Sequence, residues 1–120
     1  MLKIALHGYS TVDEMELESR LVQAVVDCRG WILEEKAVSI TGYRLRFEVG
    51  LEEIADLYAA LQQLGLHLTP MAHRELTEMC LCRKHLPPTD EAQIVLIDLY
   101  VGMLDEARTR FRNFLRIHSA

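Results

Sequence analysis

The sequence lacks the features that mark secreted and membrane proteins. Its three cysteines, Cys28, Cys80 and Cys82, are too few for a disulfide framework, and a cytoplasmic compartment would keep them reduced. No apolar run approaches the roughly 20 residues that a transmembrane helix needs. Residues 1–4 do not begin a basic region followed by an apolar one, as a signal peptide would. We therefore expect a cytoplasmic protein that has no membrane partner.

Basic side chains are also scarce. The chain has 13 Lys and Arg against 18 Asp and Glu, so its formal net charge is −5 at pH 7. A dedicated nucleic-acid binder carries an excess of basic charge, and we therefore expect no nucleic-acid partner. The segment 104–120 is the exception, with four basic and two acidic side chains. We expect this basic tail to meet an acidic surface, such as that of another copy.

The sequence does contain the mixture of strand and helix patterns that an α+β domain needs. The clearest alternation covers residues 43–49, where Tyr, Leu, Phe and Val point one way and Arg, Arg and Glu the other. Thr11 and Glu14 fit a capping box at a helix start. The periodicity along the first part of the chain predicts strands at 2–7 (ended by Gly8), 31–36, 43–49 and 66–69, and helices at 12–28 and 51–64.

The order strand, helix, strand, strand, helix, strand predicts a ferredoxin-like βαββαβ sandwich, with its core at residues 2–69 of a single domain over 1–120. Two helices would cover one face of the sheet and leave the other face open. We expect this open face to be solvated or to pair with another copy. Its side chains would be those of Lys3, His7, Arg44, Arg46 and His67.

The segment 67–85 concentrates residues that could carry chemistry. Cys80, Cys82 and His85 are candidate ligands for zinc or copper, because thiolates and imidazoles suit these ions. Only an extended backbone would bring the two thiols together, since residues two apart on a helix lie about 200° apart. The Thr-Pro pair at 69–70 favours a helix start. The usual C-x-x-C spacing is absent, so we expect no cofactor here and packed or free thiols.

The last third of the chain predicts two further elements appended to the core. Residues 94–101 are apolar on both faces apart from Asp98, which suits an interior strand or an edge strand that a partner covers. If residues 77–83 were extended, they would form a hairpin with this strand across the loop at 86–92. The tail at 104–118 has four arginines and predicts an amphipathic C-terminal helix, whose apolar side is formed by Leu104, Ala107, Phe111, Phe114 and Leu115.

Two other stretches could bind RNA or carry out acid–base chemistry, but each also fits an ordinary structural role. The Gly-Tyr pair at 42–43 fits the RNA-binding strand of RRM domains, but Thr41 and Leu45 replace the basic and the second aromatic residue of that motif. His73 with Glu75 or Glu78 is a candidate acid–base pair. A histidine on a helix more often caps or packs, and we expect no catalytic residues.

The first 69 residues resemble the ACT family of small regulatory domains. The resemblance rests on His7-Gly-Tyr-Ser10 after the first strand, on Arg29-Gly-Trp-Ile, and on Leu61-Gln-Gln-Leu-Gly65-Leu-His-Leu. Glu16-Leu-Glu-Ser-Arg-Leu21 and the stretch 73–82 are also similar to a group of uncharacterised bacterial proteins.

The ACT resemblance implies a non-enzymatic regulatory or ligand-sensing module that acts as a homodimer. It further implies that Gly8, Tyr9 and Ser10 face a small metabolite such as an amino acid. The open sheet face, the apolar strand at 94–101 and the basic tail also lead us to expect a homodimer. The alternative is a small metal- or thiol-dependent protein that uses Cys80, Cys82 and His85.

Overall fold

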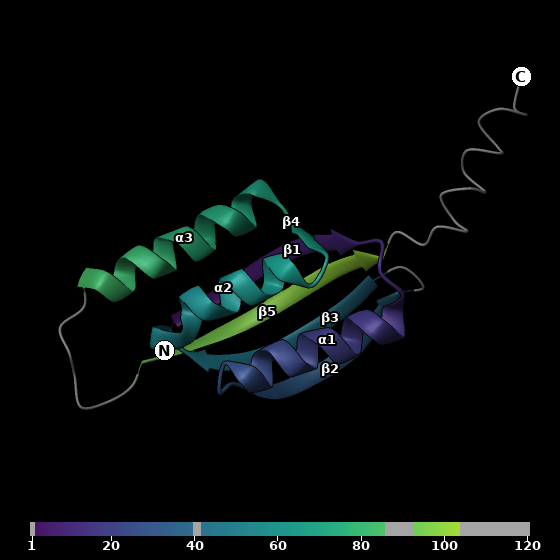
Figure 1. Ribbon diagram of the computed structural model, residues 1–120, viewed down its shortest axis with the longest axis horizontal. Coiled ribbons are helices and arrows are strands. Elements are labelled where there is room, and N and C mark those ends of the chain that lie inside the picture. Colours follow the sequence, from purple (N-terminus) through teal and green to yellow (C-terminus); the bar gives the residue numbers. More distant parts are fainter. Residues whose placement is uncertain (1, 40–41, 86–92, 104–120) are drawn as a thin grey trace, which may run out of the picture.

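The computed structural model describes residues 2–39, 42–85 and 93–103, which form an α+β fold (Figure 1). This confirms the predicted fold class. A five-stranded mixed sheet is combined with three α-helices and one turn of 3-10 helix at Leu51–Glu53. The strands are β1 (Leu2–Ser10), β2 (Trp31–Ser39), β3 (Gly42–Gly50), β4 (Leu66–Leu68) and β5 (Ile94–Met103), and the helices are α1 (Glu14–Asp27), α2 (Ile54–Gln63) and α3 (Pro70–His85).

The strand order in the sheet is β2-β3-β5-β1-β4. β5 is parallel to β1 and antiparallel to β3, and β4 pairs antiparallel with the end of β1. Over the first six elements, the order along the chain is the predicted one. The ferredoxin-like assignment is not confirmed, because β5 lies between β1 and β3. The segment predicted to be appended therefore supplies the central strand.

The composition of β5 explains its central position. Val95, Ile97 and Leu99 are buried under the helices, and both edges of the strand are hydrogen-bonded to neighbours. An edge position would leave one row of backbone N–H and C=O groups exposed on an apolar strand. Of the two predicted alternatives, the interior strand is confirmed.

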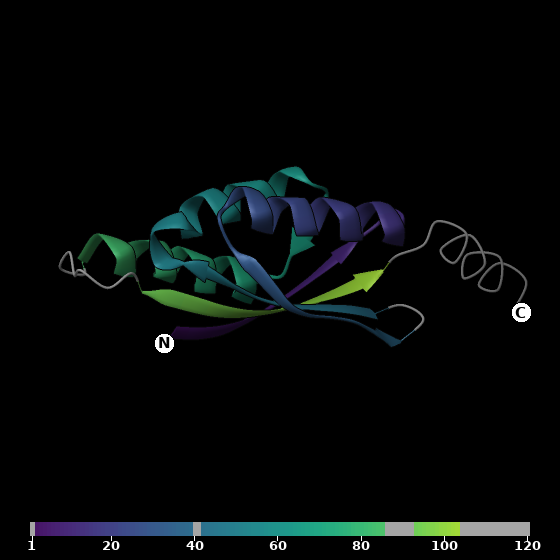
Figure 2. The ribbon, with the colours of Figure 1, turned by 90° about the horizontal axis from the view of Figure 1, so that it is seen from below.

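The three helices pack on one face of the sheet and leave the other face uncovered (Figure 2). Leu17 of α1, Leu57 of α2 and Leu76 of α3 have no exposed surface. Each leucine buried in this way contributes about 1.5–3 kcal/mol to stability. Within the described ranges, no helix is long and apolar enough to cross a membrane. The predicted C-terminal helix at 104–118 and the loop at 86–92 lie outside the described residues.

The connection from β1 to α1 differs from the prediction. β1 continues through Gly8 to Ser10, and α1 begins only at Glu14, with Asp13 as N-cap residue and no side-chain cap hydrogen bond. The predicted capping box is therefore wrong. Ser10 secures this connection instead, because its Oγ accepts a hydrogen bond from the Val12 amide (3.0 Å) and donates one to the Gly65 carbonyl (3.3 Å).

Candidate functional site

The three residues expected to face a ligand lie within β1 and have different environments. Gly8 is required by packing, because a Cβ there would lie 2.9 Å from the His67 carbonyl oxygen. Ser10 is fully buried and bonded as described above. Tyr9 is 45% exposed and lies on the open face of the sheet. Of these three residues, Tyr9 is therefore the one whose side chain can meet a ligand.

The open face carries a row of side chains across its middle strands. In the sheet register, Tyr100 of β5 is paired with Arg44 of β3 on one side and with His7 of β1 on the other. The rings of His7 and Tyr100 stack with centroids 5.0 Å apart and planes inclined by 11°. The guanidinium carbon of Arg44 lies 5.6 Å from the centroid of the Tyr100 ring, a cation–π distance.

Asp98 lies two residues before Tyr100 on β5, opposite Arg46 of β3, and binds two guanidinium groups. Its side chain is 7% exposed, although it sits on the face that α1, α2 and α3 leave uncovered. Its Oδ1 accepts hydrogen bonds from Arg46 Nε (2.8 Å) and Arg44 Nη2 (3.1 Å), and its Oδ2 accepts one from Arg46 Nη2 (3.3 Å). Hydrogen bonding from Arg46 lowers the pKa of Asp98, with help from Arg44, against the opposing effect of burial.

We call Arg44, Arg46, Asp98, Tyr100 and His7 the cationic platform. Its two guanidiniums and one carboxylate leave a net charge of +1. Arg44 Nε is buried and has no hydrogen-bond partner within the described part of the chain. Ala5, which is opposite Asp98 on β1, contributes only a methyl group to this face. Oriented guanidinium donors beside an aromatic ring are suited to a carboxylate or a phosphate.

A second aromatic pair extends this surface toward the edge of the sheet. Tyr9 stacks on His67 of β4 with ring centroids 5.1 Å apart. On β5 the residue opposite Tyr9 is Gly102, which in turn is opposite Gly42 on β3. These two glycines carry no side chain, so the strip beside Tyr9 is flat. The expected open-face residues, including His67, therefore do share one surface with Tyr9.

The cysteine-rich stretch forms the helix that its Thr-Pro start favoured, and α3 spans it to His85. Cys80 is half-buried and packs against the core, whereas Cys82 is exposed. At helical spacing their side chains diverge, so they cannot bind one ion. Among the residues that the structure describes, no three His, Cys, Asp or Glu side chains form a group that could hold a metal. The side chain of His85 lies outside the described part.

His73 and its neighbours have structural partners. The Tyr58 hydroxyl lies 2.5 Å from His73 Nδ1 and joins α2 to α3. Glu78 instead pairs with Arg74 one turn before it on α3. Cys28 is buried as expected, and desolvation raises the pKa of its thiol. These contacts favour packing over acid–base chemistry for His73.

Sequence reasoning missed Tyr100 and the central role of Asp98. Asp98 did carry a signal, because it is the single charged residue in the apolar strand β5. Its arginine partners could be identified only from the register of β3 against β5. Comparisons with protein-family models, curated proteins and solved structures found no match.

Proposed function

We propose that the protein is a non-enzymatic, ACT-like regulatory module that senses a small anionic ligand and acts as a homodimer. The order of its first six elements supports a relationship to ferredoxin-like domains in which β5 has been inserted between β1 and β3. The cationic platform is the observation that carries the ligand-sensing part of the proposal. It lies on the open face, which none of the helices α1, α2 and α3 covers.

The chemistry of the platform favours binding over catalysis. A guanidinium offers several hydrogen-bond donors in a fixed geometry and no acceptor, so Arg44 and Arg46 are suited to holding an anion. Asp98 is engaged by both arginines through three hydrogen bonds. It orients their remaining N–H groups before a ligand arrives, which lowers the entropy lost on binding.

The ligand class follows from the shape and charge of this surface. A carboxylate or phosphate would neutralise the excess charge of the arginines, and a planar or apolar remainder could lie against the rings of Tyr100 and Tyr9. Tyr9 is two residues after His7 of the platform on the same face of β1, and the residue opposite it on β5 is Gly102, which has no side chain. Amino acids and other small carboxylates fit this description.

A titration followed by NMR tests the proposal. Amino acids, dicarboxylates and inorganic phosphate would each be added to the full chain up to about 5 mM, a range that detects millimolar affinity. We expect the amide signals of His7, Arg44 and Tyr100 to shift with at least one of these probes. Arg44→Gln should weaken that binding about tenfold, because a charge-assisted hydrogen bond is lost.

The matched control is Arg74→Gln, which removes an arginine that pairs with Glu78 on the exposed side of α3. It should leave the affinity unchanged. Shifts that cluster away from the platform, or equal weakening by both substitutions, would contradict the assignment of the ligand to this face.

The proposed homodimer would form through α1 and β2, which carry most of the exposed large hydrophobic side chains among the described residues. Of the eight large hydrophobic side chains that are exposed in the described part of the chain, five lie on α1 and β2. β2 is an edge strand of nine residues, so its outer backbone groups have no strand partner among the described residues. The five are Met15, Val26, Trp31, Leu33 and Val38, with exposed fractions from 46% for Trp31 to 80% for Met15. Such an edge favours pairing with a second copy.

Light scattering tests the dimer. We expect the wild-type chain to be dimeric at about 50 μM and Leu33→Lys to be monomeric, because a buried lysine at the interface would be unpaired. Leu81→Lys on α3 is the control, since Leu81 is equally exposed (50%, against 48% for Leu33) but lies on a different element. A wild-type chain that is monomeric at this concentration would contradict the proposal.

A further inference from the structure

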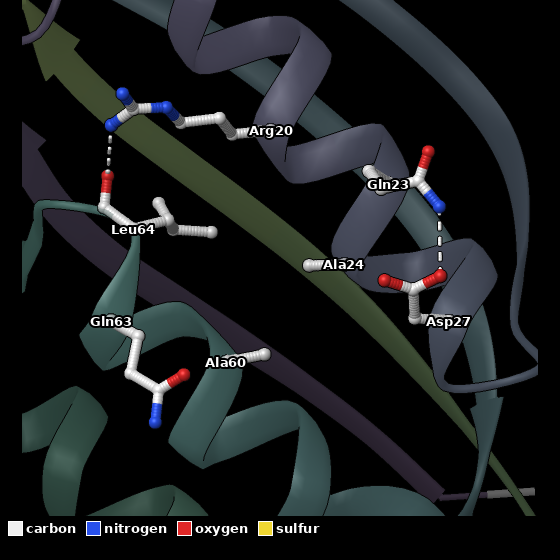
Figure 3. A pocket seen from close by; sticks show the side chains of 7 residues that line it. All are labelled: Arg20, Gln23, Ala24, Asp27, Ala60, Gln63 and Leu64. Carbon is white, nitrogen blue, oxygen red and sulfur yellow. Dashed lines mark hydrogen bonds between the residues drawn. The ribbon is translucent and has the colours of Figure 1, made fainter.

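A groove runs between α1 and α2 on the helical side of the molecule (Figure 3). Its volume is about 450 Å³. Ala24 of α1 and Ala60 of α2 line it, together with Leu64 at the end of α2. Because two alanines occupy positions where larger side chains would close the gap between the helices, the groove can accept bulky apolar groups from another segment.

The polar residues at the rim of the groove are held in place by local bonds. Arg20 donates a hydrogen bond to the Leu64 carbonyl (3.3 Å), and Gln23 donates one to Asp27 Oδ1 (2.7 Å). Figure 3 shows both bonds: the first joins α1 to the end of α2, and the second runs along α1. The rim is therefore formed before anything binds, and its Arg20 contact ties α1 to the end of α2.

We infer that this groove is the docking site of the chain's own C-terminal segment, residues 104–118. Charge is the first argument. The two segments that flank the groove, 14–27 and 51–63, carry seven acidic side chains and one basic side chain. Residues 104–118 carry four arginines and two acids. The helical side of the molecule thus has the charge that attracts the basic tail.

The tail also begins close to the groove. Met103, the last residue of β5, is paired in register with Ser10, and the Ser10 hydroxyl bonds to the Gly65 carbonyl. Gly65 directly follows Leu64, so the tail leaves the sheet close to one end of the groove. A helix of the predicted 15 residues would be about 22 Å long. α1 has 14 residues and is about 21 Å long, so the tail is about as long as the helix it would lie along.

The side-chain pattern of the tail is the third argument. Phe111, Phe114 and Leu115 are spaced to share one side of a helix and would fill the space above the two alanines. Arg108, Arg112 and Arg116 are spaced four apart and form a stripe along the flank of that apolar side. A tail docked by its apolar side would hold these arginines beside the acidic helices.

Hydrogen exchange of the full chain, measured by mass spectrometry, tests this inference. In the wild-type chain we expect amides of residues 107–116 to exchange about tenfold more slowly than in Ala60→Lys. The new lysine would fill the groove and repel the arginines. Ala59→Lys adds the same charge at the neighbouring exposed position and should leave the protection of the tail unchanged. Phe114→Ala should reduce the protection while leaving the groove intact.

The outcomes separate the possible occupants. Equal protection across protein concentrations supports docking of the chain's own tail. Protection that grows with concentration would assign the groove to the tail of a second copy and overturn the inference. Unprotected amides in the wild-type tail, or protection that survives Ala60→Lys, would also overturn it. Exchange of β5 amides serves as the folding control, because that strand is buried in the centre of the sheet.

Discussion

Replacing Asp98 by asparagine tests whether the cationic platform depends on a buried charge. The substitution preserves side-chain size but removes the negative charge that accepts three guanidinium hydrogen bonds of 2.8 to 3.3 Å. Removing one partner of a buried ion pair costs about 3–5 kcal/mol. Arg44 and Arg46 keep 20% and 32% of their side chains exposed, so water can compensate part of the loss. We therefore expect the free energy of unfolding to fall by about 3 kcal/mol, the lower end of that range.

The free energy of unfolding that Asp98→Asn removes should vary with pH. A carboxyl group whose pKa is lowered by folding contributes stability above its unfolded pKa, about 3.9, and this contribution disappears as the pH falls through the folded pKa. Asp98 is such a group, because hydrogen bonding from Arg46 lowers its pKa. Wild type and Asp98→Asn should therefore differ fully at neutral pH, begin to converge in stability below the unfolded pKa, and meet only below the folded pKa.

Urea unfolding followed by circular dichroism at neutral and acid pH measures both effects. Asp56→Asn is the control, since Asp56 is an exposed aspartate of α2, and it should change the stability by less than about 0.5 kcal/mol. A loss below about 1 kcal/mol for Asp98→Asn at neutral pH would refute the argument, because the charge would then be well solvated in the folded protein.

Three further predictions follow from individual contacts. Burial and the neighbouring Glu18 raise the pKa of Glu35, so Glu35→Gln should raise the free energy of unfolding at pH 7 by about 0.5 kcal/mol after allowance for solvent. The gain should disappear as the pH falls below the ordinary pKa of a glutamate, about 4.3, where the carboxyl is protonated in both states; equal effects at neutral and acid pH would count against this. Gly8→Ala should cost about 1–3 kcal/mol in a urea titration, because its Cβ would lie 2.9 Å from a carbonyl oxygen. Gly102→Ala should cost less, since its nearest contacts are at 3.9 Å. Cys82, which is exposed, should react with a thiol reagent in the native protein, whereas buried Cys28 should react only after unfolding.

The sequence allowed most helices and strands to be predicted, because their residues alternate or recur clearly. The alternation from Tyr43 to Val49 predicted β3, and the burial along that strand follows it residue by residue. The Thr-Pro pair at 69–70 correctly predicted that the stretch containing Cys80 and Cys82 is helical. The position of β5 in the sheet could not be predicted, since the same apolar residues 94–101 suit an interior strand or a covered edge. That choice depends on which strands are available as neighbours.

The candidate site was harder to predict because it is assembled by strand register. His7, Arg44, Asp98 and Tyr100 come from three strands that are distant in the sequence. The concentration of cysteine and histidine at 67–85 indicated a candidate site there instead, but helical geometry separates the two thiols. The sequence predicts that Gly8 ends the first strand, because a glycine commonly interrupts one. In the structure it continues the strand and allows the close approach of the His67 carbonyl oxygen.

The central position of β5 has a consequence for how the chain folds during synthesis. β1 with β4, and β2 with β3, can pair once residue 68 has emerged from the ribosome, but they remain two separate parts of a sheet. Only the arrival of residues 94–103 joins them, through a parallel pairing that connects Leu2 with Val95. Contacts so distant in sequence slow folding. A ribosome that stalls before residue 94 would release a chain with two exposed inner strand edges, which is a substrate for chaperones or for aggregation.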